Sequence, residues 1–157
     1  MESLPPEIGN LKKLKTFSVK FNHLKSLPAE IGDIEELEYL DIQYNDLESL
    51  PPEIGKLKKL SILYMNNNEL YPLPREIGNI ENLQYLVIGK NYLTELPYEL
   101  GNLTRLIELD MMNCGPMVGI PYSIANLRRL EILLVDKTIL FPYPFSPVNP
   151  RLQIVVK

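Results

Sequence analysis

One short phrase recurs along the chain at a fixed interval, and this repetition limits the fold more than any other feature. The phrase is a leucine followed by proline, and its first five copies start 23 residues apart. They are Leu4-Pro5, Leu27-Pro28, Leu50-Pro51, Leu73-Pro74 and Leu96-Pro97. A sixth copy, Ile120-Pro121, comes one residue late, after a turn-rich stretch at 115–119. Such short units cannot bury their apolar side chains alone, so the sequence predicts a stacked solenoid.

A second set of positions describes the inside of each unit. In the first full unit these positions are Leu11, Leu14, Phe17, Val19, Asn22 and Leu24, and the later units repeat them at the same spacing. Apolar residues two apart, such as Phe17 and Val19, indicate a strand with one buried face. Residues three apart fit a short helical or 3-10 turn. Proline followed by glutamate favours the start of that turn, and Gly32 and its equivalents are expected to relax or end it.

The pattern LxxLxxLxLxxNxL resembles the leucine-rich repeat superfamily from Leu4 to about Leu140, and 23 residues falls within the family's range of about 20–29. The LPxEIGNL phrasing is similar to the Ras-binding leucine-rich scaffolds of eukaryotes and, still more, to the short leucine-rich proteins of pathogenic spirochaetes. The resemblance implies an α/β solenoid of the horseshoe type. Short parallel strands would line its concave face and short helical or 3-10 turns its convex face, and protein binding would be its usual activity.

We expect a single leucine-rich repeat domain over residues 1–157. It would consist of a partial N-terminal unit at 1–10, about six repeats at 11–140, and an atypical C-terminal cap at 141–157. The slots of the sixth repeat place Thr138 and Leu140 at the asparagine and final leucine positions. Within the cap, Leu152, Ile154 and Val156 alternate as in a last edge strand. A solenoid needs such a cap over its last core layer, and a polyproline ligand for another domain is the alternative.

The asparagine slot carries a structural expectation of its own. The resemblance implies that Asn22, Asn45, Asn68 and Asn91 form a ladder, each side chain bonding to loop backbone of the neighbouring coil. Cys114 occupies this slot in the fifth unit and is expected to act as a rung through its thiol, which is a weak donor. A buried thiol is typically inert, so we interpret Cys114 as structural.

The composition of the chain argues against catalysis, metal binding, nucleic-acid binding and membrane insertion. The chain has 16 Lys and Arg against 20 Asp and Glu, and it has a single cysteine and a single histidine, His23. These residues cannot build the usual zinc sites, and no basic block suits a nucleic-acid backbone. No apolar run approaches the roughly 18 residues of a membrane helix. We therefore predict no catalytic residue, metal site, cofactor, nucleic-acid partner or membrane insertion, and we interpret His23 as a solvated loop residue.

Up to the fifth unit, the two residues after the first leucine of each unit alternate in charge between adjacent units. They are Lys12-Lys13, Glu35-Glu36, Lys58-Lys59 and Glu81-Asn82, followed by Thr104-Arg105 and Arg128-Arg129. Residues in one slot of neighbouring coils lie side by side, so the alternation predicts ion pairs between repeats. Each exposed pair would contribute only about 0.2–1 kcal/mol. A face that is merely solvated is the alternative.

Function is expected on the concave face, where residues that alternate with the core point outward. The candidate binding residues there are Tyr39, Asp41, Ile62, Tyr64, Tyr85, Val87, Glu108, Asp110 and Met112. Tyrosines among aliphatic side chains are typical of binding hot spots, and Asp136 adds to an acidic rim. The alternative is that these residues simply suit exposed strands.

The sequence thus favours a non-enzymatic, monomeric module that binds a protein or peptide with basic residues. The spirochaete-like resemblance implies a bacterial, virulence-associated factor that is secreted or held at the surface and engages a host molecule. The repeat begins in mid-pattern and no leader precedes it, so we expect a secreted protein without its leader or a cytoplasmic one. An intracellular signalling scaffold and a self-assembling solenoid are the alternatives.

Overall fold

The computed structural model describes residues 1–157. Its repeating unit is a coil that consists of a 3-10 helix, a connecting segment, a strand and a turn. The 3-10 helices are η1 (Pro6–Asn10), η2 (Ala29–Asp33), η3 (Pro52–Lys56), η4 (Arg75–Asn79), η5 (Tyr98–Asn102) and η6 (Tyr122–Asn126). The strands are β1 (Thr16–Ser18), β2 (Tyr39–Asp41), β3 (Ile62–Tyr64), β4 (Tyr85–Val87), β5 (Glu108–Asp110), β6 (Ile132–Val135) and β7 (Gln153–Val156). The predicted solenoid of short parallel strands and 3-10 turns is confirmed.

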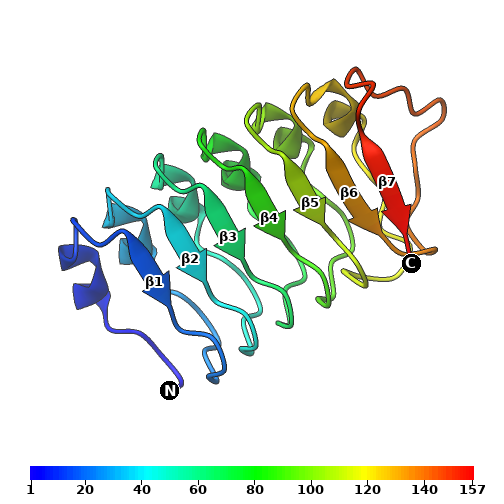
Figure 1. Cartoon of the computed structure of the whole chain (residues 1–157). Helices are drawn as coiled ribbons and strands as arrows, with labels where there is room; N and C mark the ends of the chain where they lie inside the picture. The colour runs from blue at the N-terminus through cyan, green and yellow to red at the C-terminus, as the bar shows by residue number, and fades with distance from the viewer.

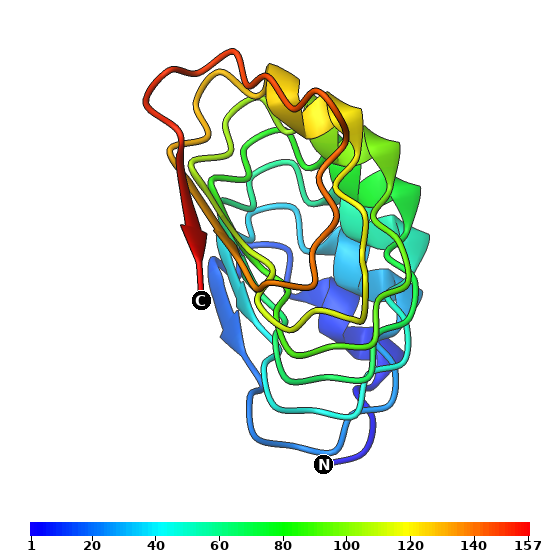
Figure 2. The ribbon, with the colours of Figure 1, turned by 90° about the vertical axis from the view of Figure 1, so that its right-hand side faces the viewer.

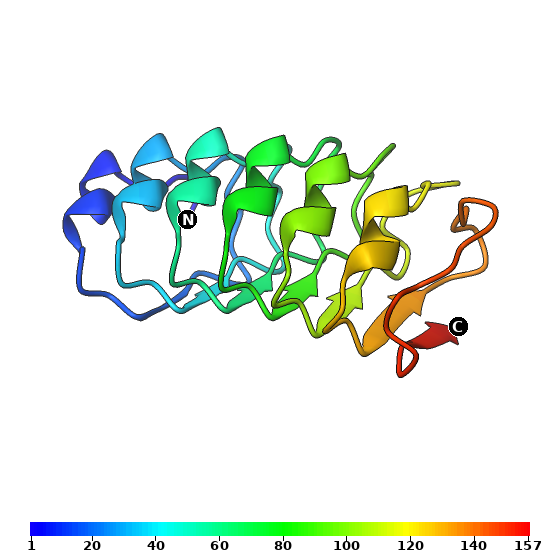
Figure 3. The ribbon, with the colours of Figure 1, turned by 90° about the horizontal axis from the view of Figure 1, so that it is seen from above.

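All seven strands form one open parallel sheet in the order β1 to β7. Figure 1 shows the strands side by side in chain order, and the end-on view of Figure 2 places them opposite the 3-10 helices. Seen from above, the helices and strands form two parallel rows (Figure 3). We call the segments from helix to strand the connecting flank and those from strand to helix the turn edge.

The strand register aligns equivalent residues of successive coils. Tyr39 of β2 pairs with Ile62 of β3, which pairs with Tyr85 of β4 and then Glu108 of β5. The other outward-facing position of these strands holds Asp41, Tyr64, Val87 and Asp110 in the same way. The 23-residue period therefore converts spacing along the chain into columns of side chains on the concave face.

The core is a single cluster that runs the length of the solenoid between sheet and helices. Leu40, Leu63, Leu86 and Leu109, the central residues of neighbouring strands, are completely buried. Neighbouring coils also approach closely at the 3-10 helices, because a Cβ on Gly32 would lie 2.3 Å from the Glu53 carbonyl oxygen. Gly32 lies inside η2. Its main role is therefore to permit coil-to-coil contact, rather than to end the turn as the sequence suggested.

The first and last coils differ from the middle ones. At the N-terminal end Leu11 is 49% exposed, whereas its equivalents in the middle coils are buried. At the C-terminal end the predicted slots are wrong by one residue, since Ile139 is buried and Leu140 is 48% exposed. The inserted turn before η6 shifts where this loop returns to the core, so Leu140 instead pairs with Gly119 in an isolated bridge.

The C-terminal segment 141–157 folds back on the last repeat. The Val148 amide donates to the Ala125 carbonyl, and the buried Asn149 side chain donates to the Leu130 carbonyl. Phe145 packs against the core, and β7 then pairs with β6 along its length. This segment therefore acts as part of the solenoid and not as an extended polyproline ligand. No helix in the chain is long and apolar enough to cross a membrane.

Candidate protein-binding surface

A ladder of asparagine side chains holds the turn edge, which fixes where each strand ends. Asn68 Oδ1 accepts from the Leu47 amide at 3.1 Å, and its Nδ2 donates to the carbonyls of Ile42 and Met65 at 3.0 and 3.1 Å. Asn45 and Asn91 make the equivalent bonds one coil earlier and one coil later. Because all three side chains are buried, these bonds satisfy backbone groups that water cannot reach.

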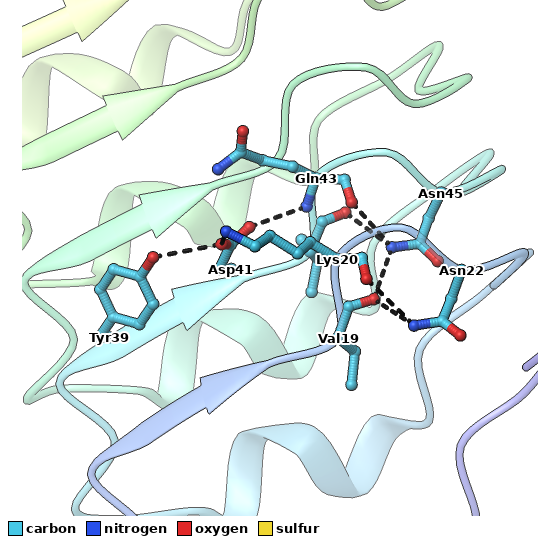
Figure 4. Close-up of polar contacts among 8 residues, drawn as sticks. Val19, Lys20, Asn22, Tyr39, Asp41, Gln43 and Asn45 are labelled. Atoms are coloured by element: carbon cyan, nitrogen blue, oxygen red, sulfur yellow. Dashed lines mark hydrogen bonds and ion pairs between the residues drawn. The ribbon is translucent and has the colours of Figure 1, made fainter.

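The two ends of the ladder differ from its middle. Asn22 Oδ1 accepts only from the exposed Met1 ammonium group, while its Nδ2 donates to Val19 and Lys20 (Figure 4). In the fifth unit the expectation for the Cys114 thiol is wrong. The Cys114 backbone carbonyl, at 2.7 Å, accepts from the Leu93 amide, and the thiol forms no hydrogen bond. The backbone carbonyl of Cys114 thus takes the place of the asparagine Oδ1 that accepts the equivalent bond in earlier units.

Burial determines the chemistry of the Cys114 thiol. The side chain is completely enclosed, and this desolvation, with the nearby carboxylate of Asp136, raises the pKa of Cys114 to about 12. Asp136 itself is held by three donors, the hydroxyl and amide of Thr138 and the amide of Asn113 in the preceding coil. Burial alone would raise the pKa of Asp136, but these hydrogen bonds outweigh it and lower the pKa.

Five side chains of β2, β3 and β4 form a continuous surface on the concave face, which we call the wall patch. They are Tyr39, Ile62, Tyr64, Tyr85 and Val87, and all are half-buried. Tyr39 and Tyr64 meet edge to face with ring centroids 5.8 Å apart. Mutual packing therefore holds the rings in place while leaving part of each accessible, which is the arrangement of a preformed contact surface.

Asp41 is not part of an accessible acidic rim, because its side chain is only 1% exposed. Its Oδ2 accepts from the Tyr39 hydroxyl at 3.2 Å and lies 3.6 Å from Lys20 Nζ, while its Oδ1 accepts from the Gln43 amide (Figure 4). The sequence interpretation of Asp41 as a direct contact residue is therefore wrong. The carboxylate instead positions the Tyr39 ring at the edge of the wall patch.

The acidic side of the wall patch comes from the next strand. Glu108 and Asp110 of β5 are half-exposed, and Asp110 Oδ1 accepts from the Met112 amide at 3.0 Å. Burial raises the pKa of Tyr64, and the carboxylates of Glu108 and Asp41 raise it further. The same two causes, burial and Asp41, raise the pKa of Tyr39. Both phenols therefore remain neutral hydrogen-bond donors beside negative charge.

Comparison with known protein families assigns this architecture. A family model described as "Leucine-rich repeat region" matches residues 5–91, and one described as "Leucine Rich Repeat" matches residues 82–103. The chain belongs to the leucine-rich repeat family. A search of curated proteins found no significant sequence match.

Several solved leucine-rich repeat structures are similar to this one. The ectodomain of the plant receptor kinase GASSHO1/SCHENGEN3 from Arabidopsis thaliana, in complex with CASPARIAN STRIP INTEGRITY FACTOR 2, matches 89% of this chain with TM-score 0.77 and 28% identity. A plant peptide hormone receptor in complex with RGF2 matches 98% with TM-score 0.75 and 29% identity. A leucine-rich repeat protein of Leptospira interrogans matches 90% with TM-score 0.60 and 28% identity. The chain covers only 19%, 30% and 47% of these proteins, respectively.

The turn edge of this leucine-rich repeat protein carries aromatic side chains that the sequence reasoning missed. Phe21 and Tyr44 stack with ring centroids 4.5 Å apart, and Tyr71 and Tyr92 pair at 5.9 Å. Phe21 and Tyr44 also have φ of 58° and 53°, a region that disfavours bulky side chains. Their signal in the sequence was an aromatic residue directly before the ladder asparagine, a slot outside the strand positions we considered.

Outside the wall patch, the connecting flank carries the predicted charge pairs. Lys12 lies 2.9 Å from Glu35, Lys59 lies 2.6 Å from Glu36, and Lys58 lies 3.2 Å from Glu81. These pairs join consecutive leucine-rich repeats from the first to the fourth. No group of three His, Cys, Asp or Glu side chains has the arrangement of a metal site, and His23 instead contacts Asp46 on an exposed loop.

Proposed function

We propose that this leucine-rich repeat protein is a non-enzymatic interaction module that binds a segment of a protein partner on the concave face. The observation that carries the proposal is the wall patch, in which tyrosine and aliphatic side chains from three consecutive strands share one accessible surface. The core requires none of these residues, since they point away from it. Large amphipathic side chains held by their neighbours lose little entropy on binding, which suits a recognition surface.

The polar groups around the wall patch indicate the chemistry of the partner. The neutral phenol of Tyr64 offers a donor to a backbone carbonyl, and Glu108 and Asp110 offer carboxylates along one side. A segment that combines an apolar side chain for the patch with a lysine or arginine toward β5 would satisfy both. Charge complementarity of this kind mainly sets specificity and the rate of association.

The solved relatives give independent support. Two of the plant receptors to which this chain is similar, at 28% and 29% identity, were solved in complex with CASPARIAN STRIP INTEGRITY FACTOR 2 and RGF2. The similarity to a leucine-rich repeat protein of Leptospira interrogans, at 28% identity, supports a bacterial origin. We propose in addition that the protein engages a host molecule from outside the cell. That setting is the further part of the proposal, and an intracellular scaffold is its rival.

The test is a pull-down that compares three proteins. They are the wild type, a variant with Tyr39, Tyr64 and Tyr85 changed to alanine, and a control variant with Tyr71, Tyr98 and Tyr143 changed to alanine. The control residues are exposed tyrosines outside the wall patch. Circular dichroism first establishes that all three fold. Each protein then serves as bait for an extract of host surface and, separately, for an extract of cytosol.

A partner captured by the wild type and the control variant, but lost by the patch variant, is the expected result. Capture from the surface extract alone would favour the extracellular setting, and capture from cytosol alone the scaffold. Equal capture by all three proteins would contradict binding at the wall patch. If the patch variant differed from wild type only in its mass in solution, the patch would serve self-assembly instead.

A further inference from the structure

Three arginines on the connecting flank of the last two repeats lack the acidic partners that three of the four equivalent lysines of earlier repeats have. Arg105, Arg128 and Arg129 line a single open hollow of about 350 Å³ together with Thr104 and Asn126. We propose that this arginine cluster is a second binding site, which takes a short acidic segment of a protein partner. It is separate from the wall patch and does not depend on the function proposed for that surface.

The contrast with the first four repeats shows that the cluster is a departure from the pattern of the chain. There three of the four equivalent lysines pair with a carboxylate of the neighbouring coil, namely Lys12 with Glu35, Lys58 with Glu81 and Lys59 with Glu36. In the fifth and sixth repeats no carboxylate lies within ion-pair distance of any of the three guanidinium groups. Their only side-chain partner is the Asn82 amide oxygen, which accepts from Arg105 Nη1.

The geometry of the cluster suits several carboxylates rather than a single small anion. Arg105 and Arg129 occupy the same slot of adjacent coils, so their attachment points are separated by about the 4.8 Å spacing of neighbouring strands. Carboxylates on alternate residues of an extended chain repeat about every 6.6 Å, a mismatch that long arginine side chains can absorb. Each guanidinium could then receive a carboxylate through two parallel hydrogen bonds.

The surroundings of the cluster favour a short acidic segment over a long polyanion. Glu81 lies on the flank of the fourth repeat, and the exposed Glu131 follows Arg129 toward the strand. A uniformly charged polysaccharide or nucleic acid that crossed the cluster would meet these carboxylates on either side. The chain as a whole also carries a net charge of -4, which opposes binding of extended polyanions.

The test uses a fluorescent peptide in which glutamate alternates with serine, and a second peptide with glutamine in place of each glutamate. Fluorescence anisotropy at about 50 mM salt, where screening is weak, measures the affinity of each peptide for the protein. The cluster variant changes Arg105, Arg128 and Arg129 to glutamine. A control variant removes the same charge elsewhere by changing Arg75, Lys90 and Lys137 to glutamine.

The wild type and the control variant should bind the glutamate peptide alike, and the cluster variant about tenfold more weakly. The glutamine peptide should bind none of them, and the wall-patch tyrosine variant should retain wild-type affinity. Equal losses in both charge variants would show a general charge effect and overturn the proposal. No binding by the wild type, or binding of a heparin fragment in preference to the glutamate peptide, would overturn it as well.

Discussion

Replacing Asn68 by alanine tests how the solenoid is held together. The change removes three hydrogen bonds, yet the carbonyls of Ile42 and Met65 each keep a second donor from Asn45 or Asn91. Only the buried Leu47 amide loses its sole partner. One orphaned buried donor costs about 1–3 kcal/mol and the lost bonds add to it, so we expect a loss of about 2–4 kcal/mol of unfolding free energy.

The matched control is Asn22→Ala at the open end of the same ladder. Its Oδ1 serves only the exposed Met1 ammonium, and Val19, which it also contacts, keeps a bond from Asn45. No buried group is left unpaired, so the expected loss is below about 1 kcal/mol. Urea unfolding followed by circular dichroism should therefore shift the Asn68→Ala midpoint by about 1–2 M and hardly move that of Asn22→Ala. Equal shifts for both variants would refute this account of the ladder.

Three further predictions concern the fifth and sixth repeats. Gly115→Ala should destabilise by at least about 2 kcal/mol in thermal unfolding, because its Cβ would lie 1.8 Å from the Leu93 carbonyl oxygen, whereas Gly119→Ala, with nothing within 4 Å, should be nearly neutral. Cys114 should react slowly with a thiol reagent at pH 8 until guanidinium unfolds the chain. With its pKa raised to about 12, its contribution to stability is full below about pH 8.5 and declines above it, so rapid native labelling would contradict its burial. The lowered pKa of Asp136 stabilises above about pH 4 and is lost as pH falls, so Asp136→Asn should reduce the acid-induced drop in melting temperature; an unchanged drop would count against its three hydrogen bonds.

The fold was predictable because the repeat imposes the same constraint many times over. A leucine that must be buried at each equivalent position leaves little freedom for the strand, and the register of Tyr39 with Ile62 and Tyr85 follows directly from the period. The fixed interval fails where the main chain deviates from it. After the inserted turn at Gly115, Ile139 is buried, whereas Leu140, which the spacing places in the core, is exposed. Spacing alone does not reveal this shift.

The candidate site was less predictable because exposure depends on neighbours from other coils. Asp41 points outward like Tyr64 in the adjacent strand, but Tyr39 and Lys20 cover it. The hydrogen bond from the Leu93 amide to the Cys114 backbone carbonyl could not be predicted either. A side-chain pattern gives no information on how closely two backbones approach. The stacked Phe21 and Tyr44 lie at turn positions with positive φ, where pattern rules favour asparagine or glycine over an aromatic residue.

Radical footprinting and hydrogen–deuterium exchange of the protein, with and without a captured partner, test whether the partner binds at the concave face. We expect protection from radical modification at Tyr39, Tyr64 and Tyr85, with no change at Tyr98 on the opposite, helical side. Slower amide exchange in β2 to β4 would accompany it. Protection confined to the 3-10 helices or to the turn edge, with the wall patch unchanged, would contradict the claim that the concave face is the binding surface.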